Sequence, residues 1–487
     1  MGDSDNFLFS SGLLLFITQI FNMGVLFSLK IFLARDLDVE QFGVLSVGIA
    51  TFSLLSTIIL FGQNTGLGRY IPRFDNDKVI RDYIISAFIS TVPVSIFICG
   101  LIAVNSDSFS ELFLNGESRT AITIFACVIP LASIMKMTVG VIQGIKQPSL
   151  KALLQDLLLP LLLGTTVITA VLIDGSPLSV AVAYLLSYSI LAFASILILF
   201  RYTPTFSRFS FKFEGIELLK FSAPLTITLI MFQILTHLDT FMIGYFSANS
   251  DVGIYTAIYP ITNLLIFVLA AFRFIFMPVF SELHEQNNIL KMKQTYASTT
   301  SWVILLTTPA FVTLILFPQQ LITIIYGSEY SSGSVALTVL SVGFFTHILL
   351  GPNRNAVTAA GSTNFVSLVA VLTGFSNVIL NILLIPSYSY VGAAVATAIS
   401  YLTWNVCLNL YLFNSFGIVP FKKDIILQLV LSGVFGTLIF LISDKWAGIE
   451  RIVVFTALFT IAYSIIFYFV GDRDKVNMIY DLVDSKF

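Results

Sequence analysis

The sequence has few charged residues: Asp, Glu, Lys and Arg together make up 11% of its 487 residues. Soluble domains carry about 25% charged residues, so this composition excludes an ordinary aqueous surface. The chain has three cysteines, Cys99, Cys127 and Cys407, and each lies within an apolar run. These cysteines and the three histidines form neither a disulfide framework nor a metal-ligand spacing. We therefore expect no metal site.

Motifs of catalysis are absent as well. The sequence has no glycine-rich phosphate-binding loop, which excludes ATP as the direct drive, and no Ser/His/Asp constellation. A membrane-embedded glycosyltransferase would be expected to carry acidic metal-binding residues or a sizeable loop domain, and neither is present. We expect no enzyme and no cofactor. The short basic loops are explained by topology and predict no binding of nucleic acid.

Long apolar runs are what the sequence does contain: 57% of its residues are hydrophobic and its mean hydropathy is +0.93. About twenty apolar residues cross a bilayer as a helix. The first run follows an acidic N-terminus and is too long for a signal peptide, so we expect a retained helix. The sequence predicts an all-α polytopic membrane protein with about fourteen transmembrane helices, at residues 11–33, 42–66, 82–104, 120–142, 153–173, 178–200, 222–246, 253–278, 296–317, 334–352, 365–386, 391–413, 425–443 and 450–470.

The distribution of Lys and Arg supports this layout. If the N-terminus lies in the cytoplasm, 18 of the 25 basic residues fall on the cytoplasmic side, 4 on the opposite side and 3 inside spans. Cytoplasmic loops of membrane proteins carry an excess of Lys and Arg. The bias predicts a multi-pass protein of the cell membrane with both termini in the cytoplasm.

The two halves of the chain resemble each other. Leu29-Lys30-Ile-Phe-Leu and Phe42-Gly43 align with Leu238-Asp239-Thr-Phe-Met and Val252-Gly253, at an offset of 209 to 210 residues. Chance similarity between apolar segments is the alternative. Six helices per copy is an even number, so both copies insert in the same orientation, related by a pseudo-two-fold axis along the membrane normal. We predict two six-helix lobes, residues 1–208 and 209–420, followed by two additional helices and a cytoplasmic tail in residues 421–487.

Three short motifs point to a family. The first is the end of the first span with the loop that follows it, from Lys30 to Phe42-Gly43. The other two are the segment Gly66-Leu-Gly-Arg69-Tyr-Ile-Pro72-Arg73 and the glycine-rich segment Gly140-Val-Ile-Gln143-Gly144. With spans arranged as six, six and two, the sequence resembles the polysaccharide-type flippases of the multidrug/oligosaccharidyl-lipid/polysaccharide exporter superfamily. The resemblance covers nearly the whole chain as a pattern of lengths and small motifs.

The resemblance implies a function. Such a flippase would move a polyprenyl-linked oligosaccharide from the cytoplasmic to the outer leaflet by alternating access. Its partners would be the lipid-linked oligosaccharide, membrane lipids and, as a further option, glycan-assembly enzymes. The cation-coupled drug exporters of the same superfamily share the fold and are the alternative. Whether protons, sodium or another force drives turnover is open.

Three cations lie inside predicted spans: Lys30 in the span 11–33, Lys136 in the span 120–142 and Arg273 in the span 253–278. A charge within a span costs several kcal/mol unless it faces a partner or a watery cavity. We interpret the three as facing one cavity at two depths, where they would bind an anionic pyrophosphate. Snorkelling and structural salt bridges are the alternatives. Cations outnumber carboxylates within the spans by 3 to 1, or 3 to 2 with Asp156, which favours an anionic substrate over a drug.

Other polar residues within spans complete the candidate site. Asp239 aligns with Lys30 in the repeat, so the two can pair as an outer gate; Asp239 can also serve as a proton or cation site. Asn side chains can bind sugar hydroxyls, but they also hold helices together, and we favour the second role. The candidate cavity residues are Gln19, Asn22, Gln143, Tyr255, Arg354, Asn377, Asn381 and Asn405.

Overall fold

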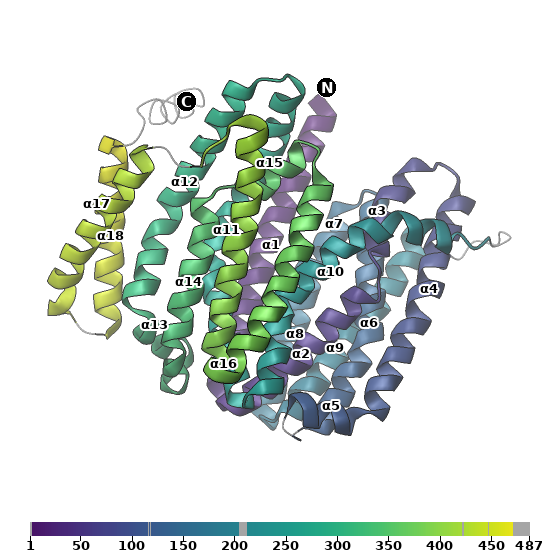
Figure 1. Cartoon of the computed structure of the whole chain (residues 1–487). Helices are drawn as coiled ribbons and strands as arrows, with labels where there is room; N and C mark the ends of the chain where they lie inside the picture. Colours follow the sequence, from purple (N-terminus) through teal and green to yellow (C-terminus); the bar gives the residue numbers. More distant parts are fainter. Residues whose placement is uncertain are drawn as a thin grey trace. The chain divides into compact units, whose positions relative to one another are not determined.

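A computed structural model describes residues 2–114, 116, 118–203, 212–420, 423–446 and 448–470 (Figure 1). Throughout these residues the regular structure is helical, and none of them belongs to a strand. This confirms the predicted all-α class. In a hydrocarbon core each backbone polar group must be satisfied within its own segment, so long apolar runs form helices.

Within the described ranges, twelve helices are long and apolar enough to cross a membrane. One of them, α16, has 54 residues and a non-helical backbone at Ser389. A helix of that length would extend about 80 Å, far more than a bilayer core, so α16 contains two crossings. α10 is a further helix of 32 residues at the predicted seventh position. The predicted number of about fourteen is therefore a close approximation.

The long helices are α1 (Gly2–Asp36), α2 (Val39–Ile58), α4 (Asp77–Val104), α6 (Arg119–Gly144), α8 (Leu159–Ile173), α9 (Pro177–Tyr202), α10 (Gly215–Phe246), α11 (Asn249–Glu285), α12 (Ile289–Leu316), α14 (Ser334–Leu349), α16 (Thr363–Phe416), α17 (Lys423–Ile442) and α18 (Gly448–Val470). Short elements lie between them: α3 (Gln63–Tyr70), η1 (Ile71–Arg73), α5 (Ser106–Phe113), α7 (Pro148–Lys151), the π-helical η2 (Ala152–Leu158), α13 (Pro318–Tyr326), η4 (Ser328–Gly333), α15 (Asn353–Ala359) and η5 (Ser443–Lys445).

Polar residues mark several helix starts, where the first N–H groups have no partner within the helix. The Asp38 carboxylate accepts from the Gln41 N–H at 2.8 Å before α2, and the Asn76 side chain accepts from the Lys78 N–H at 2.9 Å before α4. Gly62, with φ of +65°, interrupts the second predicted span between α2 and α3. A left-handed backbone at this position suits glycine, which has no Cβ.

The chain forms two compact units, residues 1–257 and 258–487, and their boundary falls within α11. The first unit therefore includes α10 and the beginning of α11. The predicted lobes, residues 1–208 and 209–420 with 421–487 as an addition, follow the sequence repeat and stay a prediction.

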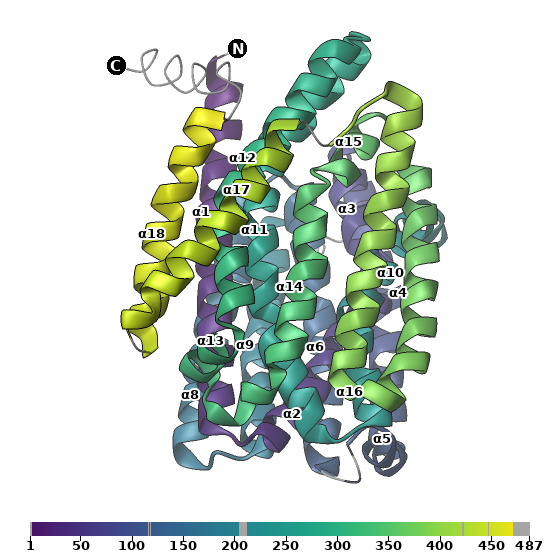
Figure 2. The ribbon, with the colours of Figure 1, turned by 60° about the vertical axis from the view of Figure 1, so that its left-hand side comes forward.

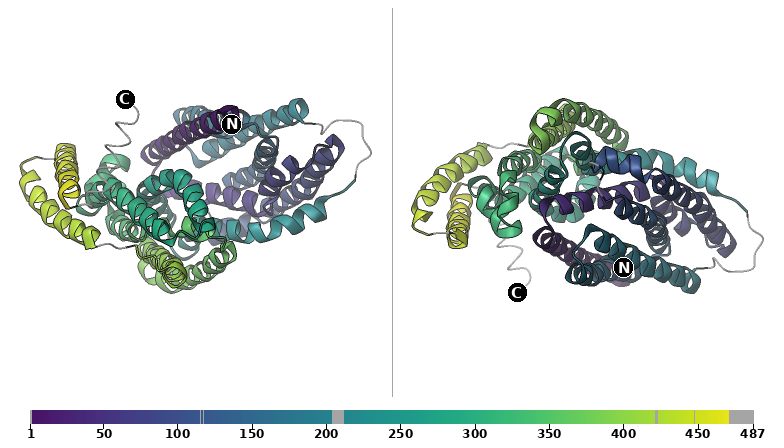
Figure 3. Two further views of the ribbon diagram at one scale, coloured as in Figure 1. Left: turned by 90° about the horizontal axis from the view of Figure 1, so that it is seen from above. Right: turned by 90° about the horizontal axis from the view of Figure 1, so that it is seen from below.

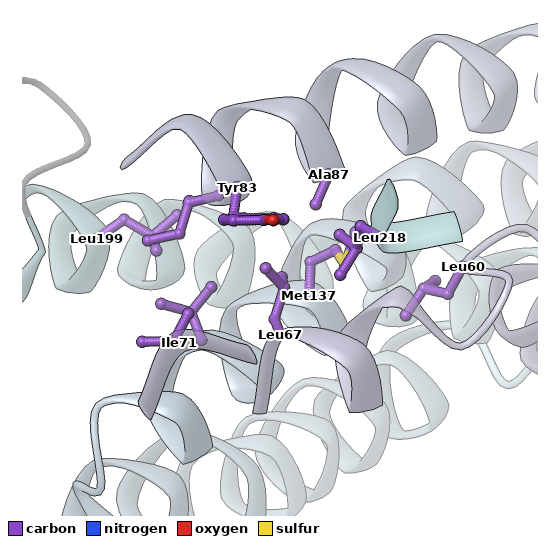
Figure 4. Packing of buried hydrophobic residues seen from close by; sticks show 10 residues of the cluster. Leu60, Leu67, Ile71, Tyr83, Ala87, Met137, Leu199 and Leu218 are labelled. Carbon is purple, nitrogen blue, oxygen red and sulfur yellow. The ribbon is translucent and has the colours of Figure 1, made fainter. Parts of the chain in front are cut away.

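The first unit has a hydrophobic core where α3, α4, α6 and α10 meet (Figure 4). Leu67, Ala87 and Met137 are fully buried there, and the Tyr83 ring packs among them. The Tyr83 hydroxyl reaches the edge of this core and donates to Glu217 Oε2 at 2.9 Å. This packing fixes α6 and α10 relative to α4.

In the second unit, α17 and α18 pack side by side (Figures 2 and 3). Phe317, which precedes α13, packs against Phe455 of α18 with ring centroids 5.1 Å apart. Arg451 pairs with Asp444 at 3.0 Å, and its guanidinium lies 4.7 Å from the centroid of the Phe440 ring. Aromatic and cation–π contacts of this kind contribute about 0.5–1.5 kcal/mol each.

A reciprocal backbone contact joins α2 to the beginning of α11. A Cβ on Gly43 would lie 1.9 Å from the carbonyl oxygen of Asn249, and a Cβ on Gly253 would lie 2.1 Å from that of Val39. The two glycines are 210 residues apart in the sequence, and so are the two residues that supply the carbonyls, Val39 and Asn249. Such reciprocity is the mark of a two-fold axis. It supports the sequence repeat at its predicted offset.

Thr256 Oγ1 and Ser46 Oγ, also 210 residues apart, hydrogen-bond at 2.8 Å beside this glycine contact. Apolar surface gains little by leaving lipid for a helix interface, so close packing at small residues is what joins membrane helices. Gly43 and Gly253 therefore allow the approach on which this contact depends.

We expect Gly43→Ala and Gly253→Ala to destabilise the protein, because each added methyl would overlap a backbone carbonyl. Overpacking of this kind costs about 1–3 kcal/mol. Gly100→Ala in α4 is the matched control, since no atom lies within 4 Å of its added Cβ. Thermal unfolding in detergent should show lower midpoints for the first two variants and an unchanged or higher midpoint for the control. Equal midpoints for all three would contradict the proposed close contact.

Candidate functional site

The first candidate site surrounds Lys136 in α6. The Lys136 ammonium donates to Ser56 Oγ at 2.7 Å and to Thr57 Oγ1 at 2.8 Å, both on α2. It also lies 3.4 Å from the backbone oxygen of Ser53. Gln233 Nε2 on α10 donates to Thr57 Oγ1 at 3.1 Å. Helices α2, α6 and α10 of the first unit thus meet around one half-buried cation.

Lys136 has no ion-pair partner among the residues that the structure describes. The atoms that accept from its ammonium are neutral oxygens of two hydroxyls and one carbonyl. Neutral oxygens replace part of the lost hydration, but they leave a net positive charge inside a span. The structural salt bridge that sequence reasoning left open is therefore not formed here. The site suits a ligand that brings its own negative charge.

Lys30 on α1 is the second cation of this unit. Its side chain is half-buried and makes no ion pair within the described part of the chain. The charges of Lys30 and Lys136 both act on the imidazole of His237, whose Nε2 lies 3.4 Å from Ser53 Oγ. The sequence predicts the two lysines at different depths of one cavity. That arrangement stays a prediction.

Asp239 lies two residues after His237, on another face of α10. It is 1% exposed, and the Tyr255 hydroxyl of α11 donates to its carboxylate. The outer gate of Lys30 and Asp239 stays a prediction.

The other residues predicted in this unit have separate surroundings. The Asn22 side chain turns to η2, where its Nδ2 donates to the Gln155 carbonyl at 3.1 Å. Gln19 and Gln143 are exposed. Gln143 lies beside Gly68 of α3. The structure does not gather these three around Lys136.

In the second unit, a helix break positions Arg354. Between α14 and α15, Gly351 has φ of +74°, and a Cβ there would lie 2.3 Å from Thr300 Oγ1. The break frees the carbonyl of Leu350, which accepts from the Tyr296 hydroxyl at 2.5 Å and from Asn409 Nδ2 at 3.3 Å. Irregular backbone within a span needs such partners.

Basic groups collect just beyond this break. Arg354 is half-buried in α15, and the charge of Arg273 on α11 acts on it. The charge of Arg354 acts in turn on His347 of α14. The His347 Nδ1 lies 2.6 Å from Asn405 Oδ1, which also accepts from Asn353 Nδ2 at 2.9 Å. The second unit thus carries its own basic cluster, which contains two of the predicted residues.

The predicted asparagines are buried between helices. Asn405 of α16 links α14 to α15 through His347 and Asn353. Asn381 Nδ2 donates to Asn377 Oδ1 one turn earlier at 3.1 Å. All three asparagines are at most 1% exposed. Asn405 thus has partners on two other helices, and the roles of Asn377 and Asn381 stay a prediction.

Sequence reasoning missed the hydroxyls that hold Lys136. Ser53, Ser56 and Thr57 follow one another at i, i+3 and i+4 on α2, and such residues share a helix face. That spacing within an apolar span was a usable signal. Sequence reasoning also missed Gln233 and assigned no function to His237. Only the packing of α10 against α2 brings these two side chains into the site.

Comparison with known proteins places the chain in a family. Residues 8–284, more than half of the chain, match the family described as polysaccharide biosynthesis protein, and residues 224–386 match the MatE family. The chain belongs to the polysaccharide biosynthesis protein family. This confirms the resemblance to the polysaccharide-type members of the exporter superfamily.

Family relatives include two proteins of Haloferax volcanii. The "Probable low-salt glycan biosynthesis flippase Agl15" is 26% identical over 420 residues, 85% of this chain and 84% of the relative. The "Probable flippase AglR" is 27% identical over 213 residues, 42% of this chain and 44% of the relative.

Solved structures share the fold of this family member. The lipid II flippase MurJ in an inward closed conformation superposes with a TM-score of 0.75 at 15% identity, over 96% of this chain and 100% of that one. An inward-facing multidrug resistance MATE family transporter gives 0.65 at 17% identity, over 79% and 93%. The fold is therefore that of MurJ and the MATE transporters.

We expect Tyr296→Phe to destabilise the protein, because the substitution removes a hydrogen bond from the free carbonyl of Leu350. An unsatisfied buried acceptor costs about 1–3 kcal/mol, and Asn409 limits the loss to the lower end. Tyr388→Phe on α16 is the control, with a side chain that is 63% exposed. Thermal unfolding should separate the two variants; identical stability would show that the Tyr296 bond contributes nothing to the break.

Proposed function

We propose that the protein is a flippase that moves a polyprenyl-(pyro)phosphate-linked oligosaccharide from the cytoplasmic to the outer leaflet by alternating access. The observation that carries this proposal is the Lys136 ammonium, held inside a span by neutral oxygens with no counter-charge among the described residues. The family, its glycan-flippase relatives and the shared fold with MurJ support the same function.

The anionic head group would bind through its phosphate oxygens. A diphosphate that approaches Lys136 can accept the hydrogen bonds that the ammonium now donates to Ser56 and Thr57. It also brings the negative charge that the site lacks. Lys30 would add a second positive charge near His237. The basic cluster of Arg273 and Arg354 offers the same chemistry in the second unit. The polyprenyl tail would stay in lipid throughout.

The orientation in the membrane follows from charge. The protein would lie in the cell membrane. With 18 basic residues on one side of the membrane against 4 on the other, both termini would lie in the cytoplasm. The substrate would then enter from the cytoplasmic side, where glycan-assembly enzymes are natural partners. Flippase and transporter relatives favour a transporter over an enzyme.

A cation-coupled multidrug or metabolite antiporter is the alternative function. The observation that favours it is the buried Asp239 carboxylate with its Tyr255 partner, a pair that could exchange a proton. The MATE structures share this fold. The excess of cations over carboxylates within the spans favours the anionic substrate.

Flipping of a fluorescent polyprenyl-diphosphate glycan in proteoliposomes tests the proposal. We expect Lys136→Gln to slow flipping by about 10- to 100-fold, because a hydrogen bond to a charged group contributes about 1.5–3 kcal/mol. Lys291→Gln is the matched control, since Lys291 is exposed at the start of α12. The control should flip at the wild-type rate.

Two results would contradict the proposal. One is flipping by Lys136→Gln at the wild-type rate, which would remove Lys136 from the path. The other is an inactive wild type that instead exports an organic cation, with loss of export in Asp239→Asn. That result would establish the antiporter.

A further inference from the structure

The side-chain amide of Gln233 on α10 has an acceptor that the first unit does not use. Gln233 is half-buried where α10 packs against α2, and its Nε2 donates to Thr57 Oγ1 at 3.1 Å. Its Oε1 accepts no hydrogen bond from the part of the chain that the structure describes. The proposed function, as stated so far, gives this amide oxygen no role.

The hydrogen bonds of Thr57 determine which end of the Gln233 amide faces it. The Thr57 hydroxyl donates its one proton to the Ser53 carbonyl at 2.9 Å, one turn earlier on α2. One lone pair of the same oxygen accepts from the Lys136 ammonium at 2.8 Å. A hydroxyl has one donor and two acceptor positions, so a single lone pair is left. That lone pair can bond only the NH₂ end of Gln233, and the amide oxygen therefore points away from Thr57.

The Gln233 amide also lies close to the cation of the proposed head-group site. Lys136 Nζ and Gln233 Nε2 bond the same oxygen, Thr57 Oγ1, at 2.8 and 3.1 Å, so they are at most about 6 Å apart. In a diphosphate-linked oligosaccharide, a single oxygen joins the first sugar to the diphosphate. A diphosphate bound to Lys136 therefore brings the first sugar next to Gln233.

The chemistry of the amide oxygen selects the sugar over the diphosphate as its partner. Diphosphate oxygens accept hydrogen bonds and gain nothing from a second acceptor such as Gln233 Oε1. A sugar hydroxyl has a proton to donate, and it can accept from the second N–H of the same amide. The free positions of Gln233 thus match a hydroxyl.

We propose that Gln233 is a specificity-determining residue whose Oε1 accepts a hydrogen bond from a hydroxyl of the first sugar, while Lys136 holds the diphosphate. This inference rests on the proposed flippase function and adds the part of the substrate that α10 recognises. Lys136 recognises the charge that every polyprenyl diphosphate carries. Gln233 recognises whether a sugar is attached.

Binding of two lipids to the purified protein tests the proposal. One is a polyprenyl diphosphate that carries a single glucose, and the other is the same lipid without the sugar. Gln233→Met keeps the length of the side chain and removes the amide. We expect this variant to bind the glucosyl lipid about 3- to 10-fold more weakly than wild type does, and the sugarless lipid equally well. Gln147→Met is the matched control, because Gln147 is exposed between α6 and α7; it should bind both lipids as wild type does.

Two results would overturn the proposal. Equal weakening of both lipids by Gln233→Met would mean that Gln233 acts on the diphosphate through Thr57 and Lys136. Unchanged binding of both lipids would mean that Gln233 recognises neither. Lys136→Gln separates this test from the proposed function, since it should weaken both lipids alike. If wild type binds neither lipid, or if Lys136→Gln binds both as tightly as wild type, the proposed function fails and this inference fails with it.

Lipids with deoxy sugars identify the hydroxyl. A set of glucosyl lipids, each lacking one hydroxyl, would be titrated into wild type and Gln233→Met. We expect one of them to bind wild type about 3- to 10-fold more weakly than the complete glucosyl lipid, with no such loss in Gln233→Met, because that variant has already lost the bond. If every deoxy lipid loses the same affinity in wild type and in Gln233→Met, no hydroxyl binds Gln233 and the proposal is wrong.

Discussion

A positive charge held inside a membrane-spanning helix by neutral oxygens is the constraint on which the first unit depends. The Lys136 ammonium is satisfied only while Ser56 and Thr57 face α6, so α2 must keep one register against it. Phe125 of α6 fixes that register by packing on Gly48, where a Cβ would lie 2.2 Å from the ring, and by stacking on Phe52 at 6.0 Å. Apolar packing thus sets the geometry of the polar site two turns away.

In the second unit, neutral side chains satisfy a backbone carbonyl that is left free at a helix break. Gly351 ends α14, and the freed carbonyl of Leu350 is held by Tyr296 and Asn409 from two other helices. This support lets α15 carry Arg354 into the neighbourhood of Arg273. In the first unit, neutral hydroxyls hold the Lys136 ammonium inside a span, which leaves this cation able to accept an anion.

Much of the fold could be predicted from the sequence, because each long apolar run must satisfy its backbone locally as a helix. The repeat was also readable, since Gly43 and Gly253 mark equivalent close contacts. Helix breaks were less predictable: Gly62 and Ser389 interrupt runs that look continuous in hydropathy.

The candidate site was only partly predictable, because it depends on neighbours that lie far apart in sequence. Lys136 could be singled out by its charge, but its hydroxyl partners lie about 80 residues earlier on α2. The expected pair of Lys30 and Asp239 followed from their equivalence in the repeat. The sequence gives no sign that the Tyr255 hydroxyl of the adjoining helix donates to the Asp239 carboxylate, because only the packing of α10 against α11 brings the two together.

Binding of the purified protein to two lipids that differ only in charge tests the central claim most directly. A fluorescent polyprenyl diphosphate and the uncharged polyprenol of the same chain length would be titrated into the protein under identical conditions. The account predicts at least about tenfold tighter binding of the diphosphate, since one charge-assisted hydrogen bond contributes about 1.5–3 kcal/mol. Equal affinities would show that the cations within the spans do not recognise the head group, and would contradict the account.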